Sequence, residues 1–246
     1  MGKLRTIAGE NQLLALLPRA ERAALEAAAT TVRPPIGEML FAPRARISRI
    51  YFPVDGVYSI VVKTRDRIVI EVATVGREGM LGTPRLLGVD HYDATVMCQI
   101  PGTLRAVDAA RFMKLVGRSP KATAIFHRYL QTHVNFVAQS AVCNRAHRIE
   151  RRCARWLLLT HDRADGDEFY LTHEFLAQML GVRRASVSVV ANALQDAGYI
   201  SYRRGRVRIR DRRRLERFVC DCYAAIRDNY EELMLGAAPS RRGARR

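Results

Sequence analysis

The thirty residues from Leu171 to Ile200, LTHEFLAQMLGVRRASVSVVANALQDAGYI, decide how this chain is interpreted. Thr172 is a favourable N-cap residue, so the pattern predicts a helix that starts there and ends just before Gly181. Gly181 supplies a turn, and a second helix is predicted from about residue 184 to residue 196. Gly198 then ends that helix as a C-cap residue. The stretch therefore predicts two short helices joined by a glycine turn.

The second predicted helix has two different faces. Its apolar positions recur at i, i+3, i+4 and i+7, which predicts packing on the first helix: Val187, Val190, Ala191 and Leu194. The opposite face would be exposed and carries Arg184, Ala185, Ser188, Val189 and Asn192. An exposed polar face at the start of a second helix is typical of a helix-turn-helix, although any pair of antiparallel helices shares the spacing.

The residues that follow support DNA binding. The sequence YISYRRGRVRIR, residues 199–210, alternates around Gly205 and predicts a β-hairpin with arginines on one face. Nine arginines occur in the seventeen positions from Ser201 to Arg217. A helix-turn-helix followed by a basic hairpin is a winged helix, whose wing lies along the phosphate backbone. The alternative interpretation is that this arginine-rich stretch is simply a run of charged residues exposed to solvent.

The composition agrees with a polyanionic partner. The 246 residues include 41 Lys and Arg against 24 Asp and Glu, a formal net charge of +17. Nearly all of this positive charge is guanidinium, which is weakly hydrated and binds phosphate in a forked geometry. Nucleic acid and an anionic membrane surface would both satisfy such a charge. With 48% hydrophobic residues, the chain has enough apolar material for folded cores.

Several classes are excluded by what the sequence lacks. The longest early apolar run, Leu13 to Leu17, is too short for a membrane span or a secretion signal, and no lipidation motif is present. Five cysteines without a CxxC pair indicate neither a disulfide framework nor a zinc ribbon. The sequence contains no nucleotide-binding glycine loop, no nucleophile elbow and no metal-ligand spacing. It therefore does not indicate an enzyme, and no catalytic residue is assigned. We expect a cytoplasmic protein with reduced thiols and no membrane partner.

Upstream of the winged helix the hydrophobic period changes. Residues 11–30 predict a helix pair broken at Pro18. From Arg33 to about Pro101 the apolar residues alternate, as in Val57–Val62 and Ile68–Val75, and glycine and proline separate the runs. Short strands with turn signals at even spacing predict a small antiparallel barrel or sandwich. The fold class is therefore α+β.

A long helical segment connects the two parts. Residues 121–160 contain neither glycine nor proline, and a break is expected near His147. The first part is apolar over so wide an arc that it must bury two sides. One side can pack on the barrel, and the other either meets a second chain as a coiled coil or is buried within one domain. The apolar positions are Ile125, Tyr129, Leu130, Val134, Phe136, Val137, Ala141 and Cys143.

This order of elements, together with the pattern LTxxxLAxxLGVxRxSV at residues 171–187, resembles the bacterial Crp/Fnr transcription regulators over about residues 10–225. The segments YFP at 51–53 and VGREGMLG at 75–82 resemble a subgroup with a degenerate sensor. The resemblance implies a cyclic-nucleotide-binding-like jelly-roll barrel at residues 1–120 and a dimerisation helix at 121–147. It also implies a winged helix-turn-helix at 148–235. Separately, we expect residues 236–246 to form a disordered basic tail that touches DNA weakly.

The same resemblance implies a homodimer joined through the helix at 121–147. Such a dimer binds a two-fold-related site in double-stranded DNA, with RNA polymerase as a further partner. The alternative is a basic protein that binds nucleic acid or a membrane surface without sequence readout. The predicted hairpin and the exposed helix face favour the regulator.

Residue roles follow from that resemblance and from the predicted geometry. Arg184 falls at a base-contacting position, and arginine to guanine is the commonest specific contact. The family usually has Ser, Glu and Arg at the positions of Arg183, Ala185 and Val189, so the family's best-known operator is not carried over. Ala185 and Val189 could instead meet thymine methyl groups, beside Ser188 and Asn192. The expected phosphate contacts are Thr172, Arg183, Ser186, Arg203, Arg204 and Arg206.

The sensor region departs from cyclic-nucleotide members of the family, which carry a Gly-Glu turn and an Arg-Ser/Thr-Ala run for the cyclic phosphate. The matching segments here are GREGM at 76–80 and YDAT at 92–95. The arginine is absent and Asp93 would repel a phosphate, which argues against cyclic AMP and cyclic GMP as effectors. The candidate effector pocket comprises Arg77, Glu78, Gly79, Met80, Arg85 and Asp93.

Other cofactors receive little support. Iron–sulfur members need cysteines near the N-terminus, but the first cysteine is Cys98, which argues against an iron–sulfur cluster. The histidines are scattered, so no metal ligand is assigned, and His91 fits a solvated loop better than a haem ligand. Cys220 and Cys222 would not face each other on one helix, so a disulfide between them is not expected. Helix packing is the preferred interpretation of this pair, with thiol sensing or metal binding as the alternative.

Overall fold

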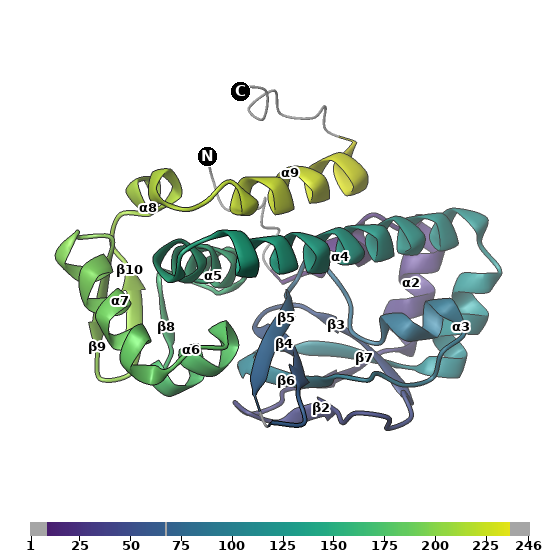
Figure 1. Cartoon of the computed structure of the whole chain (residues 1–246). Helices are drawn as coiled ribbons and strands as arrows, with labels where there is room; N and C mark the ends of the chain where they lie inside the picture. The colour runs from purple at the N-terminus through teal and green to yellow at the C-terminus, as the bar shows by residue number, and fades with distance from the viewer. Residues whose placement is uncertain (1–8, 67, 237–246) are drawn as a thin grey trace.

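A computed structural model describes residues 9–66 and 68–236 of the chain. Figure 1 shows antiparallel strands at one end, a small helical module with its own strands at the other, and the long helix α4 running across the top of the strands. The fold is α+β, as predicted. The expected tail at 236–246 lies, after its first residue, outside the described residues.

The N-terminal helix pair forms as predicted. Helices α1 (Gln12–Ala15) and α2 (Arg19–Ala28) are separated around Pro18. Asn11 caps α1, because its side-chain oxygen accepts a hydrogen bond from the backbone N–H of Leu14 at 2.9 Å. The buried Asn11 amide also donates to the carbonyl oxygens of Pro53 and Gly79, each at 2.8 Å. This one side chain therefore ties the helix pair to the strands.

The strand region consists of two antiparallel sheets, with the orders β1-β7-β3 and β2-β6-β4-β5, so the expected barrel is not closed. Two packed antiparallel sheets of this kind form a jelly roll, an architecture that limits the exposure of unpaired edge strands. The strands continue beyond Pro101, because β7 pairs with both β1 and β3. Their bounds are β1 Thr30–Val32, β2 Met39–Phe41, β3 Arg49–Pro53, β4 Val57–Lys63, β5 Val69–Val75, β6 Thr95–Ile100 and β7 Leu104–Asp108.

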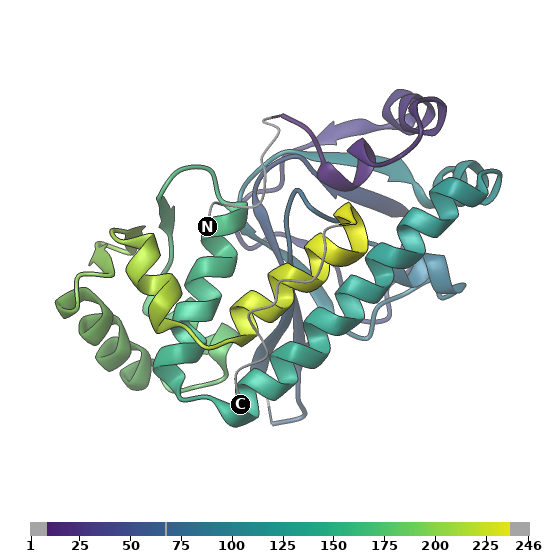
Figure 2. The same cartoon turned by 90° about the horizontal axis from the view of Figure 1, so that it is seen from above.

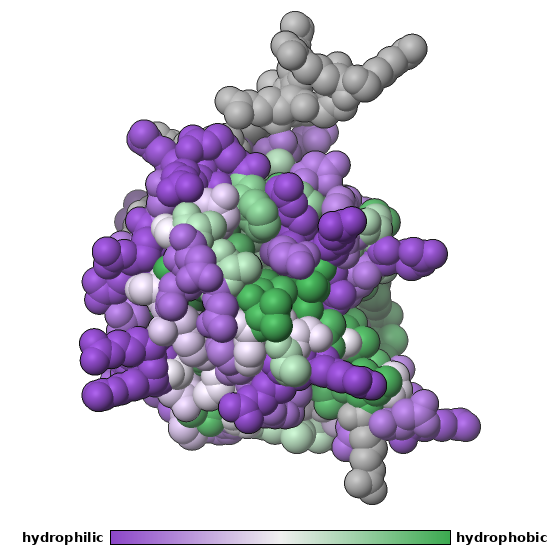
Figure 3. Space-filling view, turned by 60° about the vertical axis from the view of Figure 1, so that its left-hand side comes forward, coloured by the Kyte–Doolittle hydropathy of each residue, from purple (hydrophilic) through white to green (hydrophobic). Residues whose placement is uncertain are grey.

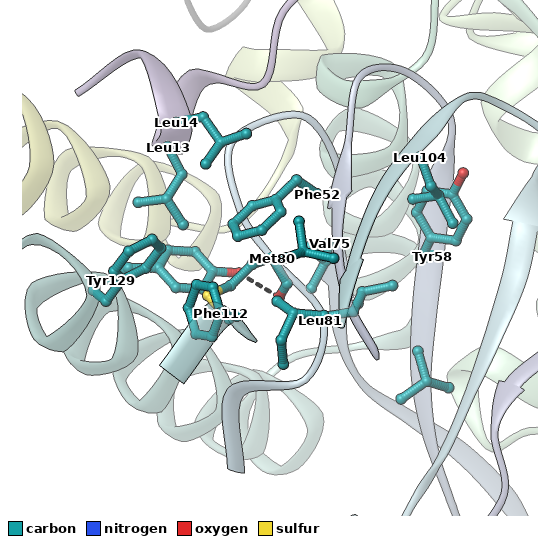
Figure 4. Packing of buried hydrophobic residues seen from close by; sticks show 14 of the residues in the cluster. Leu13, Leu14, Phe52, Tyr58, Val75, Met80, Leu81, Leu104, Phe112 and Tyr129 are labelled. Atoms are coloured by element: carbon teal, nitrogen blue, oxygen red, sulfur yellow. Dashed lines mark hydrogen bonds between the residues drawn. The ribbon is translucent and has the colours of Figure 1, made fainter. Parts of the chain in front are cut away.

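Aromatic rings fill the space between these strands and the neighbouring helices. Phe52, Phe112 and Phe126 are fully buried, with ring centroids 5.2–6.2 Å apart. Tyr129 of α4 reaches the same core, where its hydroxyl donates to the carbonyl oxygen of Met80 at 3.3 Å (Figure 4). The Phe112–Phe126 pair is edge-to-face and the other two pairs are tilted, and such ring contacts stabilise the core beyond the burial of apolar area. The core thus extends from the strands up to the long helix.

The predicted long helical segment breaks where expected. Helix α3 (Ala109–Gly117) precedes α4 (Pro120–Ala146), and α5 (Ile149–Arg163) follows it. His147 and Arg148 between α4 and α5 have extended backbone conformations. This break redirects the chain from the strand region into the helical module.

Two helices close the described chain; a helix was expected around Cys220 and Cys222, but the bounds of neither helix were predicted. Helix α8 spans Arg212–Phe218 and α9 spans Cys222–Leu235. Figure 2 shows α9 lying beside α4, and hydrogen bonds from Gln139 to Cys222 and from Asn135 to Asn229 show that the two helices are antiparallel. Helix α9 therefore covers part of the apolar arc of α4. No helix in the described ranges is both long and apolar enough to cross a membrane.

Candidate nucleic-acid interface

The helix-turn-helix forms with the predicted bounds. Helix α6 spans His173–Leu180 and α7 spans Arg184–Asp196. Thr172 is the N-cap of α6, with its hydroxyl oxygen accepting from the N–H of Phe175 at 3.1 Å. Gly181 ends α6 in the left-handed conformation, with φ of 63°, which glycine adopts without a steric penalty.

The two faces of α7 are those expected from its sequence. Its apolar face is at most 3% exposed: Val187, Val190, Ala191 and Leu194. On the other face Arg184, Ala185, Val189 and Asn192 are exposed and Ser188 is half-buried. Val189 is 69% exposed, an apolar side chain available for contact. One detail differs, because the C-cap is Ala197 and Gly198 follows it with φ of 76°.

A histidine that the sequence interpretation missed supports the reading face. His173 Nδ1 lies 3.0 Å from the hydroxyl of Ser188, which also donates to the carbonyl oxygen of Arg184 at 3.3 Å. The His173 ring packs on Tyr202 with centroids 4.4 Å apart. Burial, and then the charge of Arg184, lower the pKa of His173, so its imidazole is neutral at pH 7. These contacts fix the orientation of the half-buried Ser188 side chain at the reading face.

The basic hairpin forms a three-stranded wing. Strands β9 (Ile200–Arg203) and β10 (Arg206–Ile209) pair with each other, and β8 (Glu168–Tyr170) pairs with β10. The two turn residues, Arg204 and Gly205, both have positive φ, at 50° and 73°. A two-residue turn of this kind matches the twist of the flanking strands. It places Arg204 at the tip of the hairpin.

The wing arginines differ in how much of their charge is already paired. Arg206 and Arg208 lie 3.7 Å and 2.9 Å from the carboxylate of Glu168. Arg203 and Arg204 are exposed, and within the described part of the chain no carboxylate pairs with either. Figure 3, turned toward this module, shows long hydrophilic side chains projecting around a smaller area of apolar surface. Arg203 and Arg204 therefore present the least compensated charge of the wing.

The remaining predicted contacts flank the start of α7. Arg183 and Ser186 are exposed, and Thr172 is half-buried. Thr172 uses its oxygen as a cap acceptor and keeps its hydroxyl proton available for donation. The structure thus gathers the predicted DNA-contacting residues on one module.

The candidate effector residues do not form one pocket. Arg77 and Glu78 are buried but face the helical module, where Arg77 pairs with Asp165 and Glu78 Oε1 lies 2.8 Å from Arg163 Nε. Asp93 is on the surface, 79% exposed and paired with Arg44 at 3.0 Å. Met80 is part of the core, and Arg85 lies in the short 3₁₀ helix η1 (Thr83–Leu87). Asp93 therefore does not line a site with Glu78, and repulsion by Asp93 does not act there.

The cavity nearest to Glu78 is small. It has a volume of about 40 Å³ and lies between β5, α4, α5 and α9, lined among others by Tyr129, His133, Arg163 and Tyr230. Gly79 faces the Tyr129 hydroxyl so closely that a Cβ atom would not fit. Burial lowers the pKa of His133 to about 4, so this ring is neutral. The site holds water-sized molecules only.

Comparisons with known proteins agree with this arrangement. Residues 151–218 match the family of Crp-like helix-turn-helix domains. No curated protein matches the sequence. The fold is similar to that of a protein from Eubacterium rectale assigned to the crp/fnr family of transcriptional regulators, with TM-score 0.65 and 17% identity, covering 83% of this chain and 96% of the other.

Two further solved structures share the fold. FixK2 from Bradyrhizobium japonicum has TM-score 0.67 and 16% identity, covering 78% of this chain and 98% of the other. A CRP-family transcriptional regulator from Thermus thermophilus has TM-score 0.64 and 21% identity, covering 76% of this chain and 95% of the other. The chain therefore combines a Crp-like helix-turn-helix domain at residues 151–218 with the fold of solved Crp/Fnr regulators, which identifies it as a DNA-binding transcription regulator.

Proposed function

We propose that the protein is a cytoplasmic homodimer that binds a two-fold-related DNA site and acts together with RNA polymerase. The sensor-like region at 1–120 is followed by the dimer helix at 121–147, and the winged helix at 148–235 reads DNA. The observation that supports dimerisation is an exposed row of small and polar side chains along α4.

This row, which we name the α4 seam, repeats with heptad spacing. Its exposed positions alternate by four and three residues: His127, Gln131, Val134, Ala138, Ala141 and Arg145. Spacing of 3.5 residues keeps one stripe of a helix facing a partner helix. Val134 is 54% exposed, as is Val142 beside the seam, so apolar surface remains available after α9 has packed. The seam supports a second copy of α4 as its partner.

Two winged helices related by a dimer axis would contact one face of the DNA. Half-sites are then expected about one helical turn apart, roughly 34–36 Å. Arg184 would read guanine, Ala185 and Val189 thymine methyl groups, and Ser188 and Asn192 the remaining base edges. Thr172, Arg183, Ser186 and the wing arginines Arg203, Arg204 and Arg206 would bind phosphates.

Selection of binding sites from random DNA by the purified full chain tests this proposal. We expect enrichment of an inverted repeat. The competing function, a basic protein without sequence readout, predicts no enrichment over the input. It also predicts that random competitor DNA at physiological salt displaces the selected sequence completely.

Replacing Arg184 and Arg204 one at a time distinguishes recognition of DNA bases from binding to the phosphate backbone. Arg184→Ala should weaken specific binding by about 1–3 kcal/mol and relax preference at one position in each half-site. Arg204→Asn removes the charge while keeping a residue that suits positive φ before Gly205, so the wing should fold unchanged. It should weaken binding to all sequences alike and flatten the salt dependence by about one unit of slope. Gel shifts over a salt series measure both effects, and unchanged base preference in Arg184→Ala would contradict the docking.

Cyclic AMP and cyclic GMP should not be effectors. A buried cyclic phosphate needs a charge-assisted partner, but the Arg163 guanidinium near Glu78 is already paired. The cavity of about 40 Å³ is also far smaller than the roughly 300 Å³ or more of a small-molecule site. Isothermal titration calorimetry of the full chain should show no heat of binding for either nucleotide. Micromolar binding that also tightens DNA affinity would overturn this prediction.

A further inference from the structure

Four side chains with metal-binding atoms meet where α4 ends. Cys143 lies in the last turn of α4, His147 directly follows it, Cys220 lies between α8 and α9, and Cys222 begins α9. Their sulfur and nitrogen atoms all lie within 4.8 Å of one another. The three cysteines are at most 8% exposed, so the cluster is shielded from solvent. We name these four residues the Cys3His cluster.

Cys220 and Cys222 do not lie on one helix, unlike the prediction from their spacing. Cys220 and Cys222 were expected on one helix, pointing apart, but Cys220 precedes the helix and both side chains turn toward Cys143. Cys143 Sγ lies 3.6 Å from Cys220 Sγ, and Cys222 Sγ lies 3.5 Å from His147 Nδ1. These four residues therefore share one small volume, although 77 positions of sequence separate Cys143 from Cys220.

The other two cysteines of the chain behave as ordinary core residues. Burial raises the pKa of Cys98 and of Cys153 to about 12, which keeps both thiols protonated. Cys143 differs, because its Sγ lies 3.6 Å from Cys220 Sγ and within 4.8 Å of the metal-binding atoms of His147 and Cys222. Three thiols and an imidazole gathered in one shielded volume are unusual for helix packing, which mainly brings apolar side chains together. The contrast sets the cluster apart from the apolar core.

We propose that Cys143, His147, Cys220 and Cys222 bind one Zn²⁺ ion in a tetrahedral site. Three cysteines and one histidine are a common ligand set of structural zinc. With Zn–S bonds of about 2.3 Å, tetrahedral geometry places two sulfur ligands about 3.8 Å apart. The observed separation of 3.6 Å between Cys143 and Cys220 is close to that value. An iron–sulfur cluster, with several metal and sulfide atoms between its ligands, needs a wider cage than this one.

The surroundings of the cluster would orient its ligands. The second ring nitrogen of His147, Nε2, points to the carboxylate of Asp221 at 3.6 Å, which leaves Nδ1 to face the sulfur atoms. Gln139 Nε2 donates to Cys222 Sγ at 3.1 Å. A carboxylate behind a metal-binding histidine and an N–H donor to a thiolate are the usual outer partners of zinc sites. Asp221 is therefore a positioning residue for His147.

A zinc ion at this place would fasten three segments together. It would join the end of α4 and the break before α5 to the connection between α8 and α9. Because α8 follows the wing directly, the ion would hold the C-terminal end of the DNA-binding module against α4. Zinc binding by these four residues requires neither the dimer nor the operator.

The test uses the full chain, purified reduced and stripped with a chelator, then titrated with Co²⁺ and Zn²⁺. We expect about one ion per chain and the intense visible absorption of tetrahedral thiolate-bound cobalt, which zinc displaces. Zinc at 100 times its Kd should raise the Tm by roughly 5–10 °C. Uptake of less than a tenth of an ion by the reduced wild-type chain would refute the site, as would an octahedral cobalt spectrum.

Variants locate the ion. Cys143→Ala and Cys222→Ala should each weaken zinc binding by at least about 100-fold, whereas Cys153→Ala, the same change at a buried cysteine outside the cluster, should leave it unchanged. Asp221→Asn lies on the surface and should fold normally, and it should weaken binding by about 10-fold. If a cluster variant does not fold, the wild-type spectrum and Asp221→Asn still decide the question. Equal zinc affinity in Asp221→Asn and in the wild type, or equal loss in Cys153→Ala, would contradict the assignment.

Discussion

Ala138→Glu should convert the protein from a dimer to a monomer and weaken binding to a two-half-site operator by about 100- to 10,000-fold. Ala138 is exposed and lies in the middle of the α4 seam. In a two-stranded parallel coiled coil the same seam position of each helix meets its copy across the axis. Two glutamates would then face each other in a partly apolar contact, and like charges there cost several kcal/mol. Loss of the second winged helix removes the gain from linked half-sites.

The control is the same substitution at an exposed helix position away from the seam. Ala110 lies in α3 and is exposed, so Ala110→Glu should change neither the sedimentation coefficient nor DNA affinity. Sedimentation velocity at micromolar concentration and gel shifts with single and paired half-sites measure the effect. A dimer that persists in Ala138→Glu would show that chains associate through a surface other than α4.

The DNA-binding module could be predicted nearly residue by residue because its signals are local. Thr172 caps α6 through a neighbour three residues away, and Gly181 ends it with a backbone conformation that favours glycine. Gly205 after Arg204 specifies a two-residue turn. The apolar spacing of α7 is complete within eight residues, from Val187 to Leu194. Each of these features depends on chain segments only a few residues long.

The features that the sequence could not predict depend on distant contacts. Tyr230 reaches back to the carbonyl oxygen of Glu78 across 152 positions, which is how α9 comes to cover part of α4. The surface pair of Asp93 with Arg44 removes Asp93 from the expected pocket, although the local sequence YDAT suggested otherwise. The Cys3His cluster likewise forms only after α9 has packed. Side-chain periodicity carries no information on which distant elements meet, so these contacts needed the structure.

Glu78→Ala should lower the free energy of unfolding by about 3–5 kcal/mol. Glu78 and Arg163 form an ion pair at 2.8 Å whose side chains are only 8% and 5% exposed. The Glu78 carboxylate also accepts a hydrogen bond from the N–H of Gly76 at 3.1 Å. Removing the carboxylate leaves a buried guanidinium without its counter-charge, which costs more than the pair itself contributes. Chemical denaturation of the full chain, followed by fluorescence and circular dichroism, measures the loss.

Two further variants separate the loss of an ion pair from the burial of an unpaired charge. Asp93→Ala breaks an exposed carboxylate–arginine pair with Arg44 and should leave stability unchanged within error, because solvent screens that pair. The double variant Glu78→Met/Arg163→Met removes both charges and should recover stability to within about 1 kcal/mol of the wild type or better. Since Glu78 follows β5 and Arg163 ends α5, Glu78→Ala alone should also separate the melting of the strand region from that of the winged helix. A single unchanged transition in calorimetry, or a double variant as unstable as Glu78→Ala, would show that this pair does not couple the two halves.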